Sequence, residues 1–231
     1  MKPQIHLLTA HVKLLHMADY SGTMIRMMSY GLLKATEDDG YFRDSIKQLA
    51  PHLEGQRLEE VTELKQQMDF KTALNGAKAA GLIFMHTGLE GCLEELAAFD
   101  SKENPTDWAH LCSQKKVPLR DVLDKPQSEI LQALLEDYIH KFERDSLLEK
   151  INAMLSVLKP ASGKLQGYSY DESRLSRIDR LRNDCAHGRV DVSDFSQVYN
   201  DIEYLRSTGE FFVALLAEKH QVALDLKILP N

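Results

Sequence analysis

Arg182 and His187 are the residues of this sequence whose types and spacing best suit chemistry on a phosphodiester. They begin and end the run RNDCAH, so four residues separate them. A histidine takes or gives a proton near neutral pH, and a guanidinium binds phosphate oxygens through forked hydrogen bonds. Attack of a ribose 2′-hydroxyl on the adjacent phosphate needs a proton acceptor, a proton donor and a group that stabilises the phosphorane. One motif supplies a single histidine, so two copies of the chain would have to contribute to one site.

The motif is predicted to end a helix that runs from about residue 172 to residue 187. Asp171 is expected to cap its start, and Gly188 suits the left-handed turn that closes a helix. On an ideal helix, five residues place His187 about 140° around and about 7.5 Å along from Arg182, so the two side chains would not face one point. Arg182 also falls within the apolar arc of this helix. It is therefore expected to be buried against a partner, or the helix to be distorted near the motif.

An arginine, a polar residue directly after it, three more residues and then a histidine, near the end of a late helix, resembles the R-x4-H motif of the HEPN superfamily. The resemblance extends over about residues 72 to 220, because the long helix around residue 90 and the helix 145–158 are also similar to those of prokaryotic HEPN proteins. It implies an all-α helical bundle that cuts RNA without metal or cofactor, with two motifs facing each other in a homodimer. Arg182 and His187 would be catalytic, Asn183 and Asp184 would support them, and the product would be a 2′,3′-cyclic phosphate.

The same resemblance implies a biological setting and further partners. By analogy with the family, the expected role is phage defence or growth arrest in a system of the toxin–antitoxin kind, with an antitoxin or companion protein. In relatives paired with a nucleotidyltransferase antitoxin, a tyrosine lies two residues after the histidine. Arg189 occupies that position here, so silencing by nucleotidylation of this tyrosine is not expected.

Charge singles out the region around the motif as the predicted RNA contact. The chain carries a net charge of −7, which argues against broad, non-specific binding of nucleic acid. Residues 159–189 hold seven basic and four acidic residues, which gives this segment a net charge of +3. The rest of the chain therefore carries a net charge of −10. Arg177, Arg180 and Arg189 are the expected RNA-binding residues. A solvated helix face that mixes arginine with aspartate explains Arg177 and Arg180 equally well.

Helical periodicity dominates the elements that must position the motif. Glycine and proline breaks predict helices at about 4–36, 41–50, 56–69, 71–99, 128–143, 145–158, 172–187 and 194–220, with a short-helix connector at 106–124. Ser193 is the expected cap of the last helix, and residues 222–228 could form a short strand or a frayed tail. Residues 1–70 are interpreted as an N-terminal helical extension and residues 71–231 as the HEPN-like domain, in what is expected to be one compact unit.

Composition predicts a cytoplasmic protein. Cys92, Cys112 and Cys185 form no CxxC pair and no even disulfide framework, which favours a reducing compartment. No apolar run reaches the roughly 18 to 20 residues of a membrane span, and the first residues lack the apolar core of a signal peptide. No membrane partner is therefore expected.

No metal site is expected either. His6, His11 and His16 stand five residues apart, which spreads them around a helix. A stripe on one helix face, formed by His86, Glu90 and Glu94, could line a cleft or coordinate a metal, but a satisfied polar stripe is the favoured interpretation.

Two alternatives remain open at the level of sequence. The first is a non-catalytic HEPN module that binds and regulates a partner protein or a nucleotide. The second is an α-helical scaffold in which the motif is accidental, because an arginine and a histidine at this spacing are common in charged helices. The intact Arg182 and His187 favour the enzyme.

Overall fold

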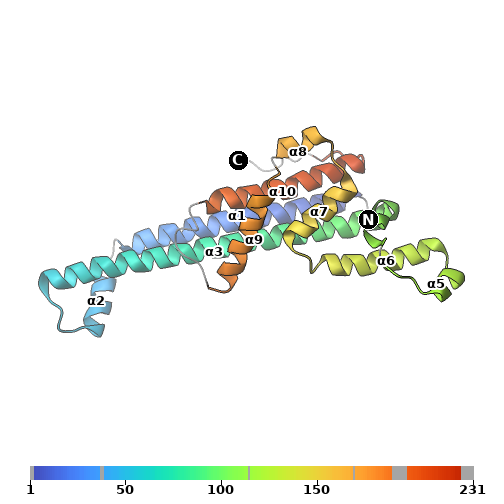
Figure 1. Ribbon diagram of the computed structural model, residues 1–231. Coiled ribbons are helices and arrows are strands. Elements are labelled where there is room, and N and C mark those ends of the chain that lie inside the picture. Colours follow the sequence, from blue (N-terminus) through green and yellow to red (C-terminus); the bar gives the residue numbers. More distant parts are fainter. Residues whose placement is uncertain (1–2, 37–38, 114, 169, 189–196, 225–231) are drawn as a thin grey trace.

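The regular elements of this protein are helices, as the sequence predicts. The structure, a computed structural model, describes residues 3–36, 39–113, 115–168, 170–188 and 197–224, and within these ranges it contains no strand (Figure 1). The α-helices are α1 (Pro3–Thr36), α2 (Asp39–Leu49), α3 (Gly55–Glu103), α4 (Pro105–Trp108), α5 (Leu119–Asp124), α6 (Gln127–Phe142), α7 (Leu147–Leu158), α8 (Ser162–Tyr168), α9 (Glu172–Ala186) and α10 (Val198–Lys219). A 3-10 helix, Ala109–Cys112, follows α4. The all-α class is thus confirmed.

The long helices α1 and α3 run antiparallel and side by side, with α10 packed along both of them (Figure 1). Two glycines allow the backbones to come this close. A Cβ atom built on Gly88 of α3 would lie 2.7 Å from the Met17 Cβ, and one built on Gly209 of α10 would lie 2.4 Å from the Leu14 Cδ2. These distances are shorter than atoms tolerate, so the seam around α1 depends on glycine at both positions.

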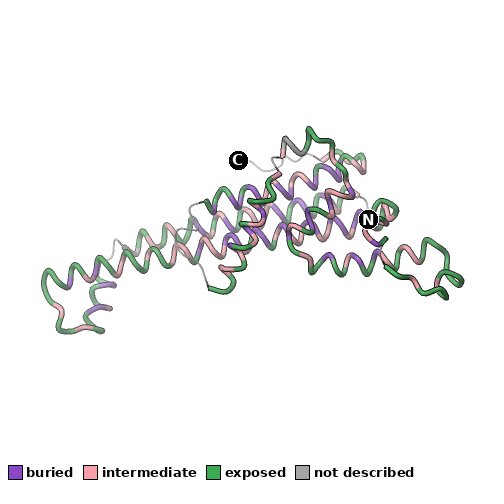
Figure 2. The backbone as a smooth tube through the Cα atoms, viewed as in Figure 1, coloured by how far each residue is buried: buried purple, intermediate pink, exposed green. Residues whose placement is uncertain are grey.

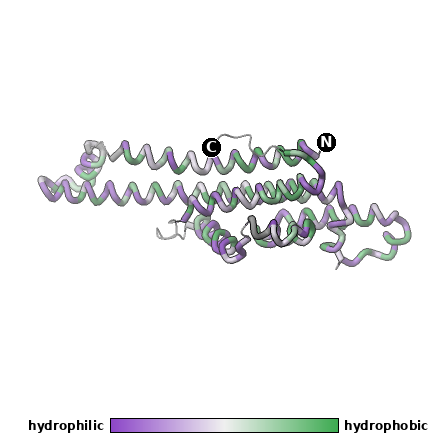
Figure 3. The backbone as a smooth tube through the Cα atoms, turned by 90° about the horizontal axis from the view of Figure 1, so that it is seen from above, coloured by the Kyte–Doolittle hydropathy of each residue, from purple (hydrophilic) through white to green (hydrophobic). Residues whose placement is uncertain are grey.

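Burial divides the long hairpin into two parts. Buried residues gather where α7, α9 and α10 cover α1 and α3, whereas the end next to α2 is largely exposed (Figure 2). The hydropathy of α3 follows this division, because its first part is mainly hydrophilic and its middle mainly hydrophobic (Figure 3). One apolar core, which includes Leu7 of α1, Leu89 of α3, Ile178 of α9 and Leu216 of α10, therefore joins the two ends of the chain.

The predicted interruption near residue 70 is wrong. The helices expected at 56–69 and 71–99 form the single helix α3, because no glycine or proline stands at their junction. The division proposed between residues 1–70 and 71–231 accordingly falls inside a continuous helix. No helix of the described ranges has both the length and the apolar character needed to cross a membrane.

The ends of α9 agree with the sequence analysis. The Asp171 carboxylate accepts a hydrogen bond from the Arg174 backbone N–H at 2.9 Å, so Asp171 caps the helix as predicted. Gly188 has a φ of +67°, the left-handed conformation expected after His187. Ser193 and the predicted start of the last helix at residue 194 lie outside the described residues. Residues 222–224 form no strand, and residues 225–231 also lie outside the described ranges.

Candidate functional site

His187 stands at the exposed end of α9. It directly follows Ala186, the last residue of the helix, and its backbone N–H donates to the Asn183 carbonyl at 3.1 Å. Both His187 and Asn183 are exposed, and Asp184 is half-buried. The helix continues without interruption to Ala186, so the distortion considered from the sequence is absent. An exposed imidazole in this position is open to solvent and can exchange protons with a bound substrate.

Arg182 lies against α3 of its own chain. Its Nη1 donates to the Asn183 Oδ1 at 2.9 Å, and its Nη2 lies 4.0 Å from the Glu90 Oε2. The Nε atom is buried and has no hydrogen-bond acceptor among the described residues, although about a third of the whole side chain, 31%, is exposed. The partner expected for Arg182 is therefore supplied within the chain, and the outer edge of the guanidinium remains available for an anion.

A buried histidine links α3 to α9 beneath Arg182. The side chain of His86 is 1% exposed, and its Nε2 lies 3.0 Å from the Asp179 Oδ1. Its Nδ1 lies 3.3 Å from the Glu90 Oε2, within ion-pair distance but not aligned as a hydrogen bond. Burial lowers the pKa of His86, but the carboxylates of Asp179 and Glu90 outweigh it and place the pKa above the ordinary value of 6.5. The structure thus favours an imidazolium between two carboxylates.

Lys150 of α7 completes this group of charges. Its ammonium, which is almost fully buried, donates to the Glu94 Oε1 at 2.6 Å and to the Glu143 carbonyl at 3.1 Å. It also lies 3.8 Å from the Glu90 Oε1. Burial raises the pKa of Glu90, yet His86, Lys150 and Arg182 together hold that pKa below its usual value. We call these three cations and three carboxylates the α3 charge network. Its members are His86, Lys150, Arg182, Glu90, Glu94 and Asp179, of which His86 and Lys150 are buried.

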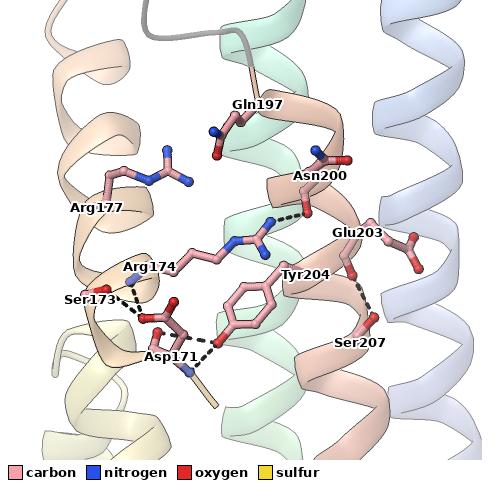
Figure 4. Close-up of a pocket in the computed structure, with 9 residues that line it drawn as sticks. All are labelled: Asp171, Ser173, Arg174, Arg177, Gln197, Asn200, Glu203, Tyr204 and Ser207. Atoms are coloured by element: carbon pink, nitrogen blue, oxygen red, sulfur yellow. Dashed lines mark hydrogen bonds between the residues drawn. The ribbon is translucent and has the colours of Figure 1, made fainter. Parts of the chain in front are cut away.

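A second cluster of charges lies on the α10 side of α9. The Asp201 side chain is fully buried, and its Oδ1 accepts from the Arg177 Nη2 at 2.6 Å and from the Arg174 Nε at 3.2 Å. The Arg174 guanidinium also lies over the Tyr204 ring, 4.4 Å from its centre, and donates to the Asn200 carbonyl at 2.7 Å. These arginines border a cavity of about 580 Å³ between the two helices (Figure 4).

Among the described residues, one side-chain hydrogen bond joins predicted site residues to each other, the bond from Arg182 to Asn183. Arg182 contacts α3, Arg177 contacts α10, and His187 points to solvent at the end of α9. Arg180 is exposed. Arg189, the third expected RNA-binding residue, lies outside the described residues.

Sequence reasoning recognised the stripe of His86, Glu90 and Glu94 but not what it binds. The favoured interpretation, a satisfied polar stripe, matches its contacts with Lys150 and Asp179. Within the described part of the chain, no group of three or more histidine, cysteine, aspartate or glutamate residues could hold a metal ion.

Lys150 and Asp201 were not singled out from the sequence. The available signal was a charged residue on the core face of an otherwise apolar helix, since buried lysine and aspartate are rare unless they are paired. Cys92, Cys112 and Cys185 form no disulfide.

Comparisons with known proteins add no family to this description. No protein-family model, curated protein or solved structure matches the chain.

Proposed function

We propose that this chain is a metal-independent endoribonuclease of HEPN type, in which two copies of the chain combine Arg182 and His187 into one active site. The observation that carries the proposal is the placement of these residues at the exposed end of α9. His187 is open to solvent, and Arg182 presents only the outer part of its guanidinium. A single chain offers one such imidazole at the motif, which is half of what the reaction needs.

The reaction would transfer protons between the substrate and the two histidines. One His187 takes the proton of the ribose 2′-hydroxyl as its oxygen bonds to phosphorus. The His187 of the second copy protonates the 5′-oxygen as the bond between phosphorus and that oxygen breaks. The products are a 2′,3′-cyclic phosphate and a free 5′-hydroxyl. Arg182 stabilises the charge on the phosphorane through its exposed N–H groups, with Asn183 and Asp184 beside it.

RNA would approach along α9, where Arg177 and Arg180 are exposed. Arg177 shares the buried Asp201 carboxylate with Arg174. Because Asp171 and Glu203 also line the adjoining cavity, the exposed Arg177 and Arg180, rather than the cavity itself, are the proposed phosphate contacts (Figure 4). A role in phage defence or a toxin–antitoxin system, with an antitoxin or companion protein as partner, follows from the resemblance alone.

A non-catalytic HEPN module that binds a partner protein or nucleotide is the second candidate. It is favoured by the contact of Arg182 with Glu90 and by the sharing of Asp201 between two arginines, because both contacts give these arginines a structural use.

Cleavage of a mixed RNA panel in excess EDTA tests the proposal. We expect the wild type to cleave and to leave 2′,3′-cyclic phosphate ends, and we expect His187→Ala to lose at least about 100-fold in rate, because it removes both proton-transfer groups of the dimer. Circular dichroism and sedimentation controls establish that the variant is folded and assembled like the wild type. Cleavage by His187→Ala at the wild-type rate, or products with other end groups, would contradict the proposed chemistry.

A further inference from the structure

Glu90 is the carboxylate of the α3 charge network that lies within ion-pair distance of all three of its cations. Its Oε2 lies 3.3 Å from the His86 Nδ1 and 4.0 Å from the Arg182 Nη2, and its Oε1 lies 3.8 Å from the Lys150 Nζ. The carboxylate therefore connects α3 to α7 and to α9 at the level of the motif. Its side chain is 21% exposed, so the protein screens these charges less than bulk water would.

We propose that Glu90 is a positioning residue for Arg182, which holds the guanidinium against α3 so that its outer edge faces the substrate. The inner edge consists of Nε, which is buried, and Nη2, which faces Glu90. The outer edge carries Nη1, which is bonded to the exposed Asn183. The guanidinium is thus fixed from both sides before a phosphate arrives, and pre-oriented groups of this kind contribute most to electrostatic catalysis.

The protonation state of His86 affects how strongly the Glu90 carboxylate attracts the Arg182 guanidinium. An imidazolium donates to Asp179 and at the same time attracts the Glu90 carboxylate as an ion pair, whereas a neutral ring carries no charge to attract Glu90. The charged groups that face His86 are Glu90 on its own helix and Asp179 on α9, with Lys150 of α7 and Arg182 of α9 behind Glu90. When His86 loses its proton, less positive charge surrounds the Glu90 carboxylate. The attraction between Glu90 and Arg182 then becomes stronger.

The buried Nε of Arg182 provides a direct readout of this contact. Among the described residues its N–H has no acceptor, and the Glu90 carboxylate lies within ion-pair distance of the same guanidinium. We expect the Nε–H signal of Arg182 in the ¹⁵N spectrum of the full chain, assigned by its loss in Arg182→Lys, to exchange slowly with solvent. In Glu90→Gln, exchange should accelerate by about 10-fold or more, because the guanidinium is no longer held against α3.

Glu95→Gln is the matched control. Glu95 lies on the same helix and undergoes the same change of charge, but its ion pair is with Lys13 of α1. Glu90→Asp is the second variant, for the case in which glutamine disturbs folding. It keeps the negative charge but shortens the side chain by one methylene group, which draws the carboxylate away from Arg182, and it should also accelerate exchange.

The kinetic consequence rests on the proposed function. With RNA as substrate, Glu90→Gln should reduce kcat by about 10- to 100-fold while KM changes little, because it displaces a group needed in the transition state. Nε–H exchange that stays at the wild-type rate in Glu90→Gln and in Glu90→Asp would overturn the positioning role. Faster exchange in these variants, together with a wild type that cleaves no RNA, would uphold the positioning of Arg182 and refute the ribonuclease.

Discussion

The geometry of the Arg182 guanidinium suits both an internal contact and the proposed contact with a substrate. The planar group carries five N–H donors on fixed edges, so one edge can face a carboxylate of the protein while another faces a ligand. Here the inner edge faces Glu90 and the outer edge faces Asn183 and solvent. A lysine at this position would present a single point charge and could not do both.

The buried imidazolium of His86 predicts a specific dependence of stability on pH. The pKa of His86 is raised in the folded chain, so the stabilisation from its proton is complete below about pH 6.5 and is lost as the pH rises through the folded value. Urea unfolding of the wild type and of His86→Gln should therefore show a larger difference in the free energy of unfolding at about pH 6 than at about pH 9. A difference that stays constant over this range would mean that His86 is not charged in the fold.

Local features of single residues could be predicted from the sequence, whereas distant partners could not. The cap at Asp171 and the left-handed Gly188 follow from residue type and from position next to a helix. The contact of Arg182 with Glu90 joins positions 92 residues apart, and nothing in the local pattern of either helix specifies it. The expectation that Arg182 and His187 point to different sides of the helix required only helical geometry, and it is one basis of the proposal that two copies of the chain form the site.

At the scale of the helices, close approach across α1 depends on glycine. Gly209→Ala would place a methyl group against Leu14, which is fully buried, and should lower the free energy of unfolding by about 1 to 3 kcal/mol. Gly91→Ala is the control, because a Cβ atom at Gly91 meets nothing within 4 Å.

The two substitutions should change the free energy of unfolding in opposite directions. Replacing a glycine inside a helix where space is available stabilises by about 0.5 to 1 kcal/mol, since the unfolded chain loses freedom. Denaturant titrations monitored by circular dichroism measure both values. Equal effects of Gly209→Ala and Gly91→Ala would show that α1 and α10 do not pack as closely as described.

Helix type and most helix ends were accessible from the pattern of apolar residues and breakers, and the continuity of α3 was not. The sequence near residue 70 changes from mainly polar to mainly apolar, which resembles the end of one element and the start of another. The change instead marks where α3 leaves the exposed part of the hairpin and enters the core (Figure 3). Different parts of one helix can be buried to different extents, because different helices pack against them. Which helices pack where cannot be read from the sequence alone.

For the molecule as a whole, the core supports the motif and the charge bears on the proposed pairing of two chains. The α1 and α10 helices share one core with α3 and α9, so residues 1–70 contribute to the support of the motif rather than standing apart from it. The exposed end of α9 belongs to residues 159–189, which carry a net charge of +3, whereas the whole chain carries a net charge of −7. A two-fold axis near His187 would double that local charge where the phosphate must bind.

Mixing wild type with His187→Ala tests this central claim most directly. The two forms are combined in varied ratios, allowed to exchange subunits, and assayed for RNA cleavage at constant total concentration. If each site needs His187 from both copies, activity follows the square of the wild-type fraction, and an equal mixture retains about a quarter of the wild-type rate. A linear dependence, with about half of the rate retained at equal mixing, would show that one copy carries a complete site and would contradict the account.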